Sequence, residues 1–95
     1  MAEAVDIDEN VLRVGARTPP HDLAAAIAHA CYEHKPPILR AIGAGAVNQA
    51  VKALAIASQY TAGRAMSLTS RIGWANVNMN GDTVSAIVFK VVIDE

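Results

Sequence analysis

A short strand-like run that meets a glycine turn and then an alanine-rich helix constrains the fold of this 95-residue chain most strongly. Residues 38–42 are apolar apart from Arg40, a Gly43-Ala44-Gly45 turn follows, and residues 46–60 have helical spacing. Such a junction leaves unpaired backbone N–H groups at the positive end of the helix dipole. The stretch therefore predicts a strand–turn–helix unit with a site for an anion at the turn.

Two further elements are predicted before this unit. Residues 10–16 alternate as a strand. Thr18 is suited to cap a helix whose first position is Pro19, and this helix extends toward His34. Pro36-Pro37 forbids its continuation into the next strand.

A hairpin is predicted after the second helix. Asn80-Gly81 favours a type I′ turn, with strands over residues 66–79 and 84–93. The apolar alternation changes phase after Trp74, which predicts a bulge or twist near Gly73. The return strand is apolar on both faces and is expected to be central or covered. The order β-α-β-α-β-β predicts one two-layer α/β (α+β) domain over residues 10–95.

Charge is distributed unevenly along the chain. Residues 1–9 contain four acidic side chains and no basic one, and they are expected to form a flexible, solvated tail. From Arg13 to Lys90 there are eight basic residues against three acidic ones. A basic body suits binding to a polyanion, although a simple solvated basic face explains the same charges.

The second helix carries two apolar stripes. Val47, Val51 and Leu54 form a bulky stripe expected to pack on the sheet, whereas an alanine stripe permits close approach of another helix or strand. The alanines are Ala46, Ala50, Ala53 and Ala57. Because two apolar faces are more than one sheet covers, we expect a homo-oligomer, a dimer or a tetramer.

Several chemistries lack their sequence signatures. The single cysteine, Cys31, excludes an internal disulfide and suits a reducing cytoplasm, and neither a secretion signal nor a membrane span is present. Cys31 and the three histidines do not have metal-ligand spacing, so no metal is expected. Asn48 stands where a dinucleotide-binding loop needs its third glycine, and no triphosphate-loop ending follows. We therefore expect no cofactor and no enzymatic activity.

Basic and amide groups near the glycine turn are the candidate contacts to nucleic-acid phosphates. Such groups hold a phosphate backbone without reading bases. The alternative is that the glycines serve only the turn and close packing. The candidate residues are Arg17, Gly43, Gly45, Asn48, Gln49, Lys52 and Arg71.

Residues 41–53, AIGAGAVNQAVKA, closely resemble the signature of the stage V sporulation protein S family. The VGAR segment at residues 14–17, the Asn80-Gly81 turn and the Ala86-Ile87 strand fall at matching intervals, so the resemblance spans residues 10–93. It implies a small bacterial protein tied to sporulation control, with no established catalytic activity.

More distantly, the resemblance implies an Alba-like fold. Alba proteins are dimeric nucleic-acid binders that use the loop after the first strand, the start of the second helix and the hairpin. Arg17 matches a lysine of the Alba loop, but Gly45 and Gln49 stand where Alba chains tend to carry basic residues, which implies weaker binding. The expected function is a regulator that binds DNA or RNA. A protein–protein adaptor and a binder of a small phosphorylated ligand are the alternatives.

Overall fold

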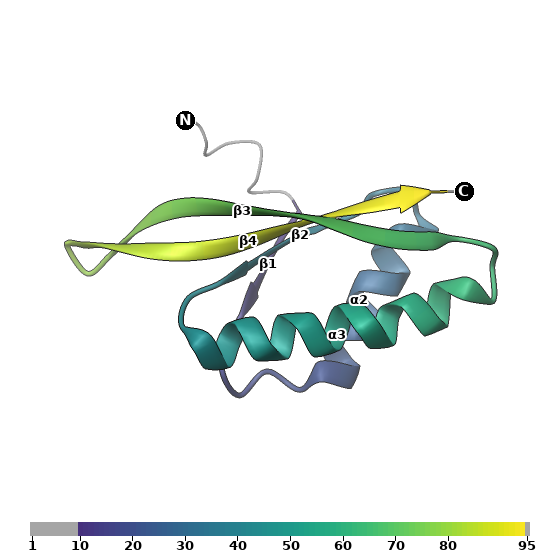
Figure 1. The fold of residues 1–95 in the computed structure, drawn as a ribbon, viewed down its shortest axis with the longest axis horizontal. Helices are drawn as coiled ribbons and strands as arrows, with labels where there is room; N and C mark the ends of the chain where they lie inside the picture. Colours follow the sequence, from purple (N-terminus) through teal and green to yellow (C-terminus); the bar gives the residue numbers. More distant parts are fainter. Residues whose placement is uncertain (1–9, 95) are drawn as a thin grey trace.

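Two helices pack on one face of a four-stranded sheet (Figure 1). The computed structural model describes residues 10–94, so the tail expected over residues 1–9 lies outside the described residues. The elements are β1 (Val11–Val14), α2 (Pro20–Tyr32), β2 (Ile38–Ala41), α3 (Ala44–Ala62), β3 (Ser67–Met79) and β4 (Asp82–Asp94). This α+β order is the predicted one.

The sheet has the strand order β1-β2-β4-β3. Strands β1 and β2 are parallel, and β4 runs antiparallel to both β2 and β3. The central position of β4 confirms the prediction made from its two apolar faces. Leu12, Leu39 and Phe89 are aligned across β1, β2 and β4 and lie on the face that the helices cover.

The long hairpin of β3 and β4 extends the sheet. Asn80 and Gly81 have φ of 53° and 86°, as the predicted type I′ turn requires. Pairing runs residue for residue from Ser67–Asp94 to Met79–Asp82, so β3 contains no bulge and that part of the expectation is wrong. The hairpin instead twists along its length (Figure 1). The apolar phase changes because β3 is an edge strand whose side chains are only partly covered.

Both helices begin at positions that differ from the expected ones. Pro19 is the N-cap of α2 and Pro20 its first residue, so the prediction that Thr18 caps the helix is wrong. Thr18 instead closes the preceding loop, because its Oγ1 accepts a hydrogen bond from the Gly15 amide at 2.8 Å. Gly43, with φ of 95°, is the N-cap of α3, which starts at Ala44 rather than near Ala46.

The alanine stripe of α3 lies inside the chain. Its four alanines are at most 2% exposed and belong to the core between the sheet and the two helices. Small side chains let α3 pack closely beside α2. The bulky stripe is buried only in part. Val47 and Leu54 pack against the core, whereas Val51 is 51% exposed, so the expectation that this stripe packs on the sheet fails at Val51.

Candidate functional site

The loop after β1 and the start of α3 meet closely. A Cβ atom on Gly45 would lie 2.9 Å from the Cβ of Ala16. Gln49 Nε2 donates a hydrogen bond to the Thr18 carbonyl at 2.9 Å, and Asn48 Nδ2 donates one to Gln49 Oε1 at 3.1 Å. Gln49 therefore ties the loop to the helix, Asn48 bonds to the Gln49 side chain, and the loop presents an exposed Arg17 next to Thr18.

The N-terminus of α3 has no side-chain cap. Gly43 offers no side chain, and the first turn contains no acidic residue. The first hydrogen bond of the helix runs from the Val47 amide to the Gly43 carbonyl at 3.1 Å. The amides of residues 44–46 precede it, and the positive end of the dipole is not neutralised there.

Two exposed cations accompany this helix start. Arg17 lies in the loop, and Lys52 lies on α3 one turn after Asn48. Backbone amides and separate cations contact phosphate oxygens without selecting a base. The arrangement suits a phosphate group of a polymer backbone.

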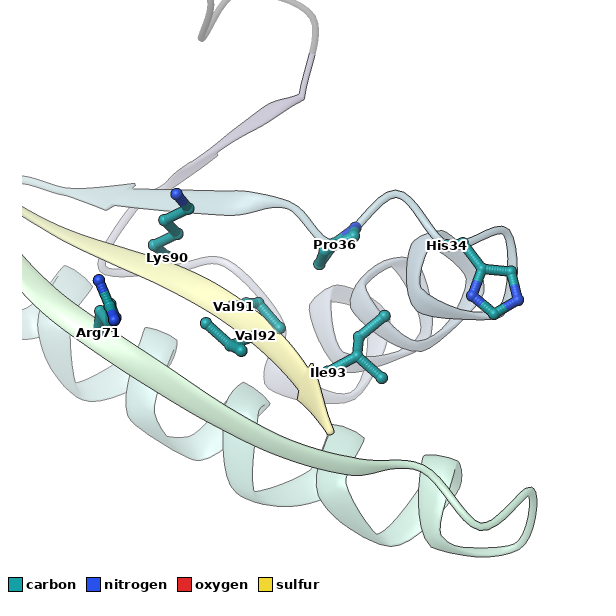
Figure 2. A pocket seen from close by; sticks show the side chains of 7 residues that line it. All are labelled: His34, Pro36, Arg71, Lys90, Val91, Val92 and Ile93. Atoms are coloured by element: carbon teal, nitrogen blue, oxygen red, sulfur yellow. The ribbon is translucent and has the colours of Figure 1, made fainter. Parts of the chain in front are cut away.

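Arg71 is the one predicted site residue that lies elsewhere. It lies on β3 opposite Lys90 of β4, and Figure 2 shows both side chains extending away from the helices. Phe89 and Val91, the neighbours of Lys90 along β4, lie in the core on the opposite face of the sheet. Six of the predicted residues therefore lie in the loop after β1, at the N-cap of α3 or in the first half of that helix, and Arg71 lies on the uncovered face.

Three further cations lie on the same face of the sheet as Arg71 and do not belong to the predicted site residues. Arg13, Arg40 and Lys90 each stand between core residues of their strands, so the alternation of each strand assigns them to the opposite face. That signal was present in the sequence. Their juxtaposition depends on the strand order, which alternation does not reveal.

Side chains that could serve metal or nucleophilic chemistry are dispersed or buried. Cys31 is fully buried, and burial raises the pKa of its thiol above the ordinary value. His29 faces Glu33 one helical turn away at 3.4 Å. Within residues 10–94, no three His, Cys, Asp or Glu side chains gather as a metal site, and no helix is long and apolar enough to cross a bilayer.

Comparison with protein families supports the resemblance read from the motif. The family model described as Stage V sporulation protein S (SpoVS) matches residues 10–94. The match covers all six elements of the fold, including the loop after β1 and the junction between β2 and α3. SpoVS is a sporulation protein family and not a known enzyme family. The chain belongs to the stage V sporulation protein S family.

Proposed function

We propose that this protein is a non-enzymatic, cytoplasmic regulator that binds the phosphate backbone of DNA or RNA as a homo-oligomer. The observation that carries the proposal is the meeting of the Arg17 loop with the uncapped start of α3, fastened by the bond from Gln49 to Thr18. The β-α-β-α-β-β order is also that of the Alba-like proteins that the sequence resembles.

Binding through these groups is expected to depend on salt and little on base sequence. Each phosphate neutralised by Lys or Arg releases counterions, which sets the slope of log Kd against log salt. Arg17→Ala and Lys52→Ala should each weaken binding to unrelated oligonucleotides alike and lower that slope by roughly one unit.

Fluorescence anisotropy titrations test the expected salt dependence. They use duplex DNA, single strands and structured RNA at several salt concentrations. Lys35→Ala is a matched control: it removes one exposed charge beyond the far end of α2, about 20 Å of helix away from the loop. Loss of affinity that is equal in Lys35→Ala and in the site variants would contradict a localised contact.

A protein–protein adaptor is the second candidate, and the exposed apolar residues favour it. Ile72 and Trp74 of β3 are 70% and 68% exposed. Large exposed apolar side chains of this kind mark interaction surfaces. The adaptor hypothesis predicts no titratable binding to any nucleic acid at low salt, with both site variants indistinguishable from the parent.

A further inference from the structure

The face of the sheet away from the helices is strongly cationic. One basic residue comes from each strand: Arg13 from β1, Arg40 from β2, Lys90 from β4 and Arg71 from β3. The strand neighbours of Arg13, Arg40 and Lys90 belong to the core or pack against it, and Arg71 is the direct partner of Lys90, so the pleat directs the four cations to the uncovered face. They are half of the eight Lys and Arg residues of the chain.

These cations lie directly opposite one another on neighbouring strands, in two pairs of like charge. Arg13 is the direct partner of Arg40, and Arg71 is the direct partner of Lys90. Like charges directly opposite each other destabilise a sheet. Within residues 10–94, none of the four has a carboxylate at ion-pair distance. Two uncompensated like-charge pairs on one face suit an anionic ligand that would relieve the repulsion.

The face is also hollowed beside one of these pairs. A depression of about 580 Å³ is lined by Arg71 and Lys90, by aliphatic side chains of β4, and by His34 and Pro36 from the segment between α2 and β2. Figure 2 shows the two cationic side chains rising from adjacent strands on the same side. An anionic group in this depression would be reached from two strands at once.

The surroundings of the cations indicate which anion fits. The most exposed large apolar residues, Ile72 and Trp74, are paired with Phe89 and Ile87 and so lie on the helix side of the sheet. A surface that binds membranes combines basic and bulky apolar side chains, and base stacking needs exposed aromatic rings. The described strand residues of the cationic face include no aromatic ring, and the aliphatic side chains between the cations, Val11, Ile38, Val88 and Val92, are only partly exposed. An array of cations across three strand spacings, about 14 Å, matches a polymer with closely spaced phosphates.

We propose that Arg13, Arg40, Arg71 and Lys90 form a second phosphate-binding surface for nucleic acid, separate from the loop and helix start that contain Arg17 and Lys52. The inference rests on the proposed function, because it concerns the same class of polymer. With cations on two sides, one molecule contacts two segments of nucleic acid.

Anisotropy titrations of a short fluorescent DNA duplex between about 50 and 200 mM salt test the second surface. The variants are Arg13→Gln/Arg40→Gln and Arg71→Gln/Lys90→Gln. Each should lower the slope of log Kd against log salt by about 1.8 units, since two phosphate contacts are lost. Thermal melts should show both variants folded, because removing a like-charge pair does not weaken the sheet.

Arg64→Gln is the matched control for charge. Arg64 is exposed after α3, where its guanidinium lies 3.8 Å from the centre of the Tyr32 ring. Neutralising it should leave the salt slope unchanged.

The outcomes separate the two proposals. If both double variants keep the salt slope of the parent while Arg17→Ala and Lys52→Ala weaken binding, the second surface is overturned and the proposed site remains. The reverse pattern supports the second surface and overturns the loop site. A parent protein that binds no nucleic acid overturns both. The double variants are also tested with phosphatidylserine vesicles and with polyglutamate. If they lose binding to either of these but still bind the duplex, the second surface for nucleic acid is overturned.

Discussion

At the scale of single residues, the two glycines of the junction between β2 and α3 are needed for different reasons. Gly43 has φ of 95°, a region that L side chains rarely adopt, whereas Gly45 leaves no space for a methyl group beside Ala16. We expect Gly43→Ala and Gly45→Ala each to lower the free energy of unfolding by about 1–2 kcal/mol. Urea denaturation measures the change.

Gly63→Ala is the control for these substitutions. Gly63 has φ of −64°, and a Cβ there would meet only the Tyr60 carbonyl at an ordinary 3.7 Å. This variant should match the parent or gain up to about 1 kcal/mol. A Gly45→Ala protein as stable as Gly63→Ala would refute the close approach at Ala16.

Cys31 should make stability depend on pH in alkaline solution. Burial raises the pKa of its thiol, so the unfolded chain loses the thiol proton at a lower pH than the folded protein does. The thiol's contribution is complete below the ordinary thiol pKa of about 8.5 and is lost as pH rises through the raised value. We expect a decline of at most about 1.4 kcal/mol per pH unit above pH 8.5.

The Cys31→Ala variant isolates this effect from the titration of other groups. Denaturation of both proteins at a series of alkaline pH values gives the difference in slope. The same alkaline slope in the parent and in Cys31→Ala would assign the decline to other residues.

At the scale of elements, α3 shows how a helix composed largely of small residues packs. Ala50 and Ala53 are fully buried within the chain, so a carboxylate at either position would have to enter the core. We expect Ala50→Glu and Ala53→Glu to prevent cooperative folding rather than only to dissociate an assembly, because an unpaired buried charge costs several kcal/mol. Circular dichroism melts measure the loss.

Ala55→Glu provides the matched control on the same helix. Ala55 is exposed, and helix propensity differs little between alanine and glutamate. If Ala50→Glu folds and melts like Ala55→Glu, then the alanine stripe accepts a buried carboxylate, and the expected loss of folding is wrong.

At the scale of the whole molecule, an apolar surface on the helix side remains without a partner within the described residues. It contains Ile72 and Trp74 on β3, and Val51 on α3 is also more than half exposed. This surface, rather than the alanine stripe, is the basis for the proposed homo-oligomer. Ile72→Arg and Trp74→Arg should therefore yield folded monomers, measured by light scattering at micromolar concentration.

Met79→Arg serves as the control, because Met79 lies beside the hairpin turn and is also exposed. It should leave the assembly intact. Trp74 is the only tryptophan of the chain, so its emission should shift to longer wavelength when dilution separates the subunits. A parent protein that is monomeric under these conditions would remove the oligomer from the proposal.

The sequence by itself determined the elements and their order. Period-two and helical spacing predict each strand and helix, Asn80-Gly81 predicts the turn, and two apolar faces predict the central position of β4. These features are local, since each depends on residues a few positions apart. Arg17 and the glycine turn were likewise predictable as neighbours of a helix start.

Only the tertiary structure decided which faces meet. The stripe of alanines and the stripe of bulky residues are both apolar, and only the packing of the elements buries the alanines fully and the bulky residues in part. Arg71 belonged by sequence to the same candidate set as Arg17, yet the pleat of β3 places it with Arg13, Arg40 and Lys90. Spacing along the chain reveals the side of a strand on which a residue lies. Which residues of other strands lie next to it on that side depends on strand order and register, and long-range pairing sets both.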